Sequence, residues 1–228
     1  DTYETYNYGG LITQWPYLFY WINGRIINAL NLMIPSLSDW QLLVTLRIIN
    51  TFYSVGTLIF CYLFSKELIQ NKWWQLLPVF LMTNTINFVF VAGGLSYDNL
   101  LNMLAMAGLY FLVRVLKHKD FVVNSLAWMI FISAGTLTKR SALPLALAMG
   151  GVWILFIIKN HRQILPLKFN YRKVLLSIIF SLFLIGNLGL YGYNLVVYKS
   201  ILPGCTDILT KEQCNLTQYA WRLENYAL

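Results

Sequence analysis

The sequence predicts an all-α fold: a polytopic bundle of about six transmembrane helices, with one amphipathic helix in the outer membrane interface. Three observations predict it. The composition is apolar, the apolar residues form long runs, and basic residues cluster between alternate runs. Hydrophobic residues make up 58% of the 228 residues and charged residues only 11%, whereas soluble domains carry about 25% charged residues. So few charges cannot solvate a globular surface, and we therefore expect membrane lipid to cover much of it.

The formal net charge of +8 has two interpretations. A strongly basic soluble domain is typical of nucleic-acid binding, but this chain shows no soluble basic module. In a membrane protein, Lys and Arg collect in cytoplasmic loops. We therefore assign the charge to membrane topology and expect no nucleic-acid partner.

Six apolar runs approach the ~20 residues that a helix needs to cross a bilayer. They are Gln41–Phe64, Trp73–Val91, Leu100–Val115, Phe121–Leu137, Ala142–Ile158 and Val174–Tyr198. Basic clusters follow the first, third and fifth runs: Lys66 and Lys72; Arg114, Lys117 and Lys119; Lys159, Arg162, Lys168, Arg172 and Lys173. The positive-inside rule places these three connections in the cytoplasm. Both termini are then external, and we expect a prokaryotic cytoplasmic membrane.

An amphipathic segment, Trp15–Asn31, precedes the first run. Arg25, Asn28 and Asn31 recur every three residues, which places them on one helical face, while aromatic and aliphatic residues fill the other. The pattern favours a helix lying in the outer interface; a tilted span is the alternative. Residues 1–39 are thus predicted to form an external loop and interfacial helix, and residues 40–198 the transmembrane domain.

Residues 199–228 form a polar tail that we expect to be external. It contains Cys205 and Cys214, whereas Cys61 lies inside the first run. Two external cysteines so close in sequence predict a disulfide. The chain opens with neither an initiator Met nor a basic signal-peptide region, which predicts that it is part of a longer protein.

Lys139 and Arg140 occupy a very short external connection, against the positive-inside trend. Two adjacent cations between apolar spans require an anionic partner or access to water. They match phosphate oxygens well, which predicts a phosphate clamp; the alternative is two side chains that snorkel to the interface. Arg47 lies roughly 10 Å deep in the first span, at ~1.5 Å per residue, with Asn50 on the same face. It is a further candidate for phosphate binding, unless it too reaches outward.

Three external carboxylates are candidates for chemistry. Asp98 ends a Gly-rich turn, where it could bind a metal, accept a sugar hydroxyl or cap the third helix. Asp1 and Glu4 precede the interfacial helix, where a general base needs a carboxylate, although a solvated loop carries the same residues. The sequence has no GxxxxGK[ST] nucleotide loop and no HExxH zinc motif.

The order of these features has a precedent. An acidic loop leads into the aromatic segment Gln14–Trp21, then a span with Leu46-Arg47-Ile48-Ile49-Asn50, a turn ending in Asp98, and Leu137-Thr138-Lys139-Arg140. This order resembles the C-type (GT-C) polyprenyl-phosphate-sugar glycosyltransferases, which include protein O-mannosyltransferases and lipid A aminoarabinose transferases. A bacterial and archaeal branch has a tail similar to Tyr198–Cys205, in which Lys199 stands where the branch has Gly.

The resemblance implies an inverting transfer on the external face, from a polyprenyl-phosphate-linked sugar to an acceptor hydroxyl. Lys139 and Arg140 match the family's Leu-Thr-Lys segment, whose cations stabilise the departing lipid phosphate. Asp98 matches its second acidic position. The family's base is a carboxylate of the first external loop, represented here by Asp1 and Glu4, although the family's Asp lies farther upstream. The resemblance leaves a divalent cation open as a cofactor.

Two alternatives to a transferase stay open. One is a transporter or flippase for a lipid-linked or anionic solute, and the other is a non-catalytic membrane subunit. Transporters usually bind their substrate near the midplane, within inverted repeats. Here the polar candidates cluster at one face and no repeat is evident in the sequence, which favours the transferase.

Overall fold

The computed structural model describes residues 16–35, 37–164, 170–208 and 210, and every regular element in these ranges is a helix. The elements are α2 (Leu18–Met33), α3 (Asp39–Leu68), η2 (Trp74–Leu76), α4 (Leu77–Thr83), α5 (Ile86–Ala92), α6 (Tyr97–Leu116), α7 (Phe121–Thr138), α8 (Ala142–Ile164), α9 (Tyr171–Asn187), η3 (Leu188–Gly192), α10 (Tyr193–Tyr198) and α11 (Cys205–Ile208). The predicted all-α class is confirmed.

Five helical rods are long and apolar enough to cross a membrane. They are α3, α6, α7, α8 as far as Asn160, and the continuous run of α9, η3 and α10. Each overlaps one of the predicted spans, as expected of an integral membrane protein. The run from α9 to α10 contains one turn of π-helix, η3, where the backbone accommodates an extra residue.

The remaining predicted span, 73–91, is bent. Two helical pieces, Trp74–Thr83 and Ile86–Ala92, meet at an angle of 68°. Only together are they long and apolar enough to cross a membrane, either as a broken span or as a re-entrant loop. Three successive polar residues lie at the break. Thr83 and Asn84 donate side-chain hydrogen bonds to the Phe80 carbonyl, at 3.0 and 2.8 Å, and Thr85 donates to the Leu81 carbonyl at 2.8 Å. Such bonds to the preceding turn compete with helix continuation.

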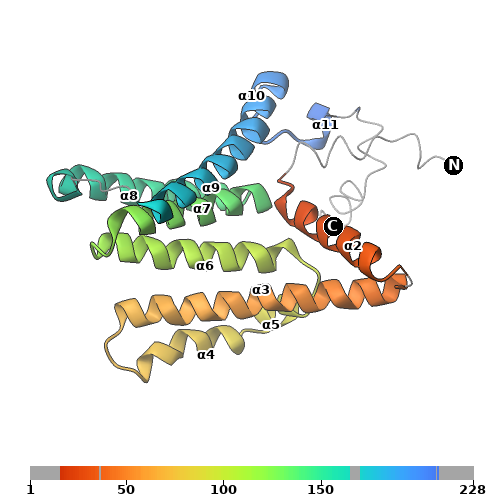
Figure 1. The fold of residues 1–228 in the computed structure, drawn as a ribbon, viewed down its shortest axis with the longest axis horizontal. Coiled ribbons are helices and arrows are strands. Elements are labelled where there is room, and N and C mark those ends of the chain that lie inside the picture. Colours follow the sequence, from red (N-terminus) through yellow and green to blue (C-terminus); the bar gives the residue numbers. More distant parts are fainter. Residues whose placement is uncertain (1–15, 36, 165–169, 209, 211–228) are drawn as a thin grey trace, which may run out of the picture.

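The helix α7 forms the centre of the bundle. The helix α6 packs against both α3 and α7, and α9 packs on α7 (Figure 1). In the most apolar 18-residue window of each rod, 61% of α7 is buried but only 6% of Tyr171–Tyr198. The α9–α10 rod therefore presents most of its apolar surface outward, where lipid is expected. One core cluster, Leu112, Trp128, Ile132 and Met149, joins α6, α7 and α8.

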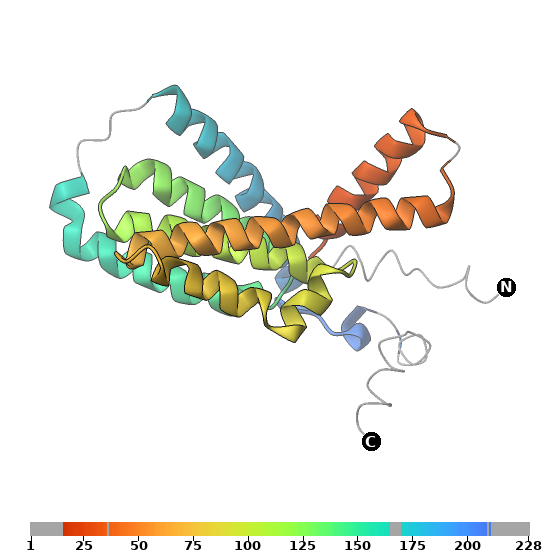
Figure 2. The same cartoon turned by 90° about the horizontal axis from the view of Figure 1, so that it is seen from below.

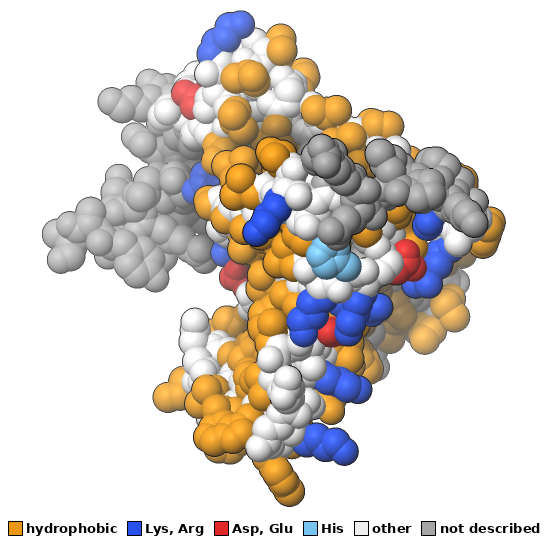
Figure 3. All heavy atoms as spheres, turned by 90° about the vertical axis from the view of Figure 1, so that its left-hand side faces the viewer, with side chains coloured by type: hydrophobic (Ala, Val, Ile, Leu, Met, Phe, Trp, Pro, Cys, Tyr) orange, Lys and Arg blue, Asp and Glu red, His pale blue; other side chains and the backbone are white. Residues whose placement is uncertain are grey.

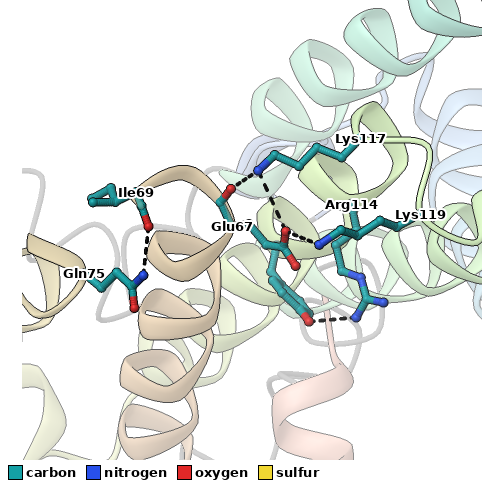
Figure 4. A network of polar contacts seen from close by, with 7 residues as sticks. Glu67, Ile69, Gln75, Arg114, Lys117 and Lys119 are labelled. Atoms are coloured by element: carbon teal, nitrogen blue, oxygen red, sulfur yellow. Dashed lines mark hydrogen bonds and ion pairs between the residues drawn. The ribbon is translucent and has the colours of Figure 1, made fainter. Parts of the chain in front are cut away.

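The connections alternate between the two ends of the bundle. Figures 1 and 2 show the α3–η2 and α6–α7 connections at one end and the α5–α6 and α7–α8 connections at the other. Lys and Arg side chains gather on the first end (Figure 3). There Lys119 Nζ forms an ion pair with Glu67 Oε2 at 2.7 Å, and Lys117 Nζ lies 3.9 Å from the same oxygen (Figure 4). We call this the basic end and the other the Asp98 end. Which end faces the cytoplasm stays a prediction.

The segment α2 is a helix, as predicted, and diverges from the start of α3 (Figure 2). Its expected polar residues, Arg25, Asn28 and Asn31, are all exposed. Ser38 then begins α3 with a capping box. Its hydroxyl accepts from the Gln41 amide, and the Gln41 side chain accepts from the Ser38 amide. The location of α2 in a membrane interface stays a prediction.

Candidate functional site

Asp98 and Lys139, which are 41 residues apart, form an ion pair at the Asp98 end. Lys139 Nζ donates to Asp98 Oδ1 at 2.7 Å. Asp98 lies in the first turn of α6, and Lys139 is the extended residue that ends α7. Their side chains remain 31% and 35% exposed, for Lys139 and Asp98 respectively. The sequence singled out both residues for separate reasons, and the fold brings them together in reach of an incoming ligand.

The aromatic ring of Tyr97 supports this pair. Lys139 Nζ lies 4.7 Å from the centre of the Tyr97 ring, a cation–π contact. Tyr97 in turn makes edge contacts with Phe19 and Tyr20 of α2, with ring centres 6.3 and 6.5 Å apart. The ammonium of Lys139 is therefore held from two sides, by a carboxylate and by a ring. Sequence analysis did not assign Tyr97 a role, because one Tyr among 15 carries no distinguishing pattern.

A buried asparagine fixes the turn that carries Asp98. Asn99 is 1% exposed. Its amide donates to the carbonyls of Val91 and Gly94, at 2.8 and 3.2 Å, and its Oδ1 accepts from the Ser54 hydroxyl at 3.0 Å. These bonds close the end of α5 onto the start of α6 and tie both to α3. The turn before Asp98 is thereby pinned from inside the bundle.

A second buried asparagine completes the support. Asn50 of α3 is fully buried, and its Oδ1 accepts from the Ser96 amide at 3.3 Å. Ser96 is the N-cap of α6, because its hydroxyl accepts from the Asp98 amide at 3.1 Å. The capping role considered for Asp98 thus belongs to Ser96. The Asp98 carboxylate is left to hold Lys139, near the positive end of the α6 dipole.

The two arginines of the predicted clamp differ in position. Arg140 directly follows Lys139, just before α8, and its side chain is exposed. Arg47 is also exposed, whereas Asn50, expected on the same helical face, points into the bundle. The two side chains therefore differ in environment, although residues three apart lie on the same side of a helix. No hydrogen bond or ion pair links the Arg47 side chain to another described residue, and its role in phosphate binding stays a prediction.

A half-open cleft lies beside the ion pair. It has a volume of about 500 Å³ and lies between α2, the first turns of α3 and the turn before α6. Its walls include Phe19, Tyr20, Asn23, Leu46, Leu95 and Tyr97. Tyr97 is shared, since it faces this cleft and also contacts Lys139. Partial burial raises the pKa of the Tyr20 hydroxyl, and the nearby Tyr97 adds to the effect.

Several predicted site residues lie outside the described part of the chain. Asp1, Glu4 and Cys214 fall in ranges that the structure does not describe, and of Cys205 only the backbone is placed, at the start of α11. The predicted base and disulfide therefore stay predictions. Within the described residues, no three His, Cys, Asp or Glu side chains gather to hold a metal ion. Asp98 has the Lys139 ammonium beside it instead.

No protein-family model, curated protein or solved structure matches the chain.

Proposed function

We propose that the protein is a membrane glycosyltransferase that moves a sugar from a polyprenyl-phosphate donor to an acceptor hydroxyl at the Asp98 end. The observation that carries the proposal is the Asp98–Lys139 pair, with Arg140 next in sequence. The carboxylate of Asp98 neutralises the ammonium of Lys139, and the exposed Arg140 adds one positive charge at the next position of the chain. The helix α8 begins at Ala142, two residues after Arg140, and its N-terminus is the positive end of its dipole. The group therefore favours an anion such as a phosphate monoester or diester.

The chemistry follows from this charge arrangement. An acceptor oxygen forms a bond to C1 of the sugar while the bond from C1 to the phosphate oxygen breaks, and the acceptor proton passes to a carboxylate base. Asp1 and Glu4 are the candidates for that base. The electron pair of the broken bond stays on the polyprenyl phosphate. Lys139 and Arg140 stabilise this developing charge, which is the contribution that accelerates such a step. Asp98 acts as a positioning residue, because it fixes the ammonium before the ligand arrives.

One observation favours the transporter alternative. Broken helices are common around transporter substrate sites, and α4 and α5 meet at a 68° break. However, Thr83, Asn84 and Thr85 at this break are all exposed, and their hydroxyl and amide donors already bond to the preceding turn. The three residues also do not line the cleft beside Tyr97. The transferase is therefore the better-supported proposal.

The test compares turnover of single variants in the full protein. The substrate is a pool of lipid-linked sugars extracted from the native membrane, and release of polyprenyl phosphate is followed by mass spectrometry. We expect Lys139→Ala and Arg140→Ala each to lower turnover by about 10²–10³-fold, as for one lost preorganised contact. Lys139→Arg should retain part of the activity, because the charge remains while the donor geometry changes.

The matched control is Lys72→Ala. Lys72 is an exposed cation in the connection after α3, at the basic end, and its removal should leave turnover within a few-fold of wild type. Folding of each variant is checked by its melting temperature. Folded Lys139→Ala and Arg140→Ala proteins that transfer sugar as fast as Lys72→Ala would contradict the proposal and move the transporter ahead.

A further inference from the structure

We infer that the cleft beside Tyr97 is the subsite for the sugar ring of the donor, and that Asn23 is the residue that reads a sugar hydroxyl. The inference rests on the proposed function, because it takes the sugar to be attached to the phosphate held at Lys139 and Arg140. It adds a second, uncharged half to that site. Asn23 is neutral, and nothing in the local sequence distinguishes it from other asparagines.

The orphaned amide oxygen of Asn23 is the first observation. Asn23 is only 7% exposed and lines the cleft. Its Nδ2 donates to the Phe19 carbonyl at 2.9 Å, whereas its Oδ1 is buried without a hydrogen-bond partner in the described structure. A buried acceptor left unpaired costs free energy. A ligand that supplies an O–H or N–H donor would satisfy this atom.

The lining of the cleft is the second observation. None of the described residues that line it is charged. Three of its walls are the aromatic rings of Phe19, Tyr20 and Tyr97. A sugar ring has an apolar face of C–H groups, which packs on aromatic rings, and an edge of hydroxyls, which donate to acceptors such as an amide oxygen. The volume of about 500 Å³ also lies within the usual range of small-molecule sites.

The position of the cleft is the third observation. Tyr97 lines the cleft and contacts the Lys139 ammonium at 4.7 Å from its ring centre. A ligand whose neutral half occupies the cleft and whose anionic half meets Lys139 would therefore contact Tyr97 with both halves. A glycosyl phosphate has this division of polarity. The competing occupant is a prenyl chain, which would pack on Leu46 and Leu95 but would leave Asn23 Oδ1 unsatisfied.

The test separates the sugar from the phosphate and from the lipid chain. The full protein in lipid nanodiscs is titrated with farnesol, with farnesyl phosphate, and with a panel of farnesyl-phosphate hexosides, aminohexosides and pentosides. We expect at least one glycosylated probe to bind about tenfold or more tightly than farnesyl phosphate, because it adds a hydrogen bond and a stacking contact. Asn23→Leu should abolish this preference and leave farnesyl phosphate binding unchanged. Asn23→Asp keeps an acceptor oxygen and should preserve part of it.

Asn84→Leu is the matched control. Asn84 makes the same local bond as Asn23, from Nδ2 to the carbonyl four residues earlier, at 2.8 Å, but it is exposed and lies outside the cleft. It should keep the full sugar preference. Unchanged farnesyl phosphate binding also reports that Asn23→Leu is folded.

Each contrary outcome overturns a different claim. If no glycosylated probe binds more tightly than farnesyl phosphate, or if Asn23→Leu keeps the preference, the sugar subsite is wrong while the phosphate clamp stands. If Asn23→Leu instead binds farnesol more tightly, the cleft holds the lipid chain. If Lys139→Ala and Arg140→Ala bind farnesyl phosphate as well as wild type does, the proposed function fails, whatever the cleft binds.

Discussion

The buried side chain of Asn99 makes more hydrogen bonds to other helices and turns of the bundle than the charged side chains of the candidate site do. Its side chain joins α3, the end of α5 and the turn before α6. Replacement by Leu keeps a similar volume but removes partners from two carbonyls and one hydroxyl. Each buried group left unpaired costs about 1–3 kcal/mol. We expect Asn99→Leu to lower the free energy of unfolding by about 2–4 kcal/mol, measured by denaturant titration in mixed micelles.

The control for this prediction is again Asn84→Leu, because Asn84 is exposed and its amide bonds only to its own helix. Its effect should stay within about 0.5 kcal/mol. A comparable loss for both variants would mean that the Asn99 network is not what stabilises the turn. Hydrogen exchange over residues 92–96 gives a second measurement, since these amides should exchange faster in Asn99→Leu only.

Lys199 adopts a backbone conformation that favours glycine. It has φ 56° and follows the last residue of α10, a left-handed position typical of helix ends. A side chain in this region costs roughly 1–2 kcal/mol. We expect Lys199→Gly to raise the free energy of unfolding by about 1 kcal/mol, whereas Lys199→Val should lower it. Equal stabilities for the two variants, measured by the same titration, would show that the conformation is not maintained.

Charged residues of the candidate site could be predicted from the sequence. Lys139, Arg140 and Asp98 stood out because a charge at a membrane boundary needs an explanation. Asn23, Tyr97 and Asn99 are neutral, and their importance depends on which atoms of other helices they meet. That information is absent from local sequence. Asn50 was noticed, but only as a neighbour of Arg47, and its burial against α6 could not be foreseen.

Among the helices, α6 and α7 approach closely at Gly108. A Cβ atom added there would lie 2.9 Å from Ile132 Cδ1 and 3.0 Å from Ile132 Cγ1. Small residues at such contacts let membrane helices pack by van der Waals interaction. We expect the overpacking in Gly108→Ala to cost about 1–3 kcal/mol, of which the higher helix propensity of Ala returns up to about 1 kcal/mol, so the free energy of unfolding should fall. Thermal melting in nanodiscs would measure the change.

The cause can be separated from the change of glycine itself. In the double variant Gly108→Ala/Ile132→Val, a shortened neighbour makes room, and we expect part of the lost stability to return. Gly150→Ala is the matched control. Nothing lies within 4 Å of a Cβ there, so helix propensity alone should stabilise it by up to about 1 kcal/mol. The packing explanation would be contradicted if the double variant lost as much free energy of unfolding as the two single variants lose together.

The number and position of the helices could largely be predicted, because a bilayer imposes a minimum apolar length on each span. The break in the predicted span 73–91 could not. Hydropathy averages over a window, and Thr83, Asn84 and Thr85 only dilute that average slightly. The helix is interrupted at Thr85, whose backbone is extended (φ −82°, ψ 115°), and hydropathy carries no information about the backbone conformation of a single residue.

Across the whole molecule, the two ends have different chemistry. At the basic end, Glu67 is only 14% exposed and lies between Lys117 and Lys119, which are 42% and 50% exposed (Figure 4). Exposed lysines of this kind can meet anionic headgroups of a cytoplasmic leaflet. At the Asp98 end, Lys139 is paired with Asp98, and Arg140 follows it in the sequence. The division agrees in direction with the positive-inside rule, which gave the predicted topology.

The topology can be tested with single cysteines in intact cells. Cys61, Cys205 and Cys214 are first replaced by Ser, and one cysteine is then introduced at Lys119, Arg162, Ser36 or Thr210. We expect a membrane-impermeant thiol reagent to label the cysteines at Ser36 and Thr210 but not those at Lys119 and Arg162. The reason is that moving a basic cluster such as Lys117 and Lys119 across the membrane is opposed by the orientation bias of cytoplasmic loops. Permeabilised cells give the control, since all four positions should then react. Labelling at Lys119 in intact cells, with Ser36 protected, would show that the molecule has the opposite orientation in the membrane. The Asp98–Lys139 pair would then face the cytoplasm, where an external sugar transfer could not take place.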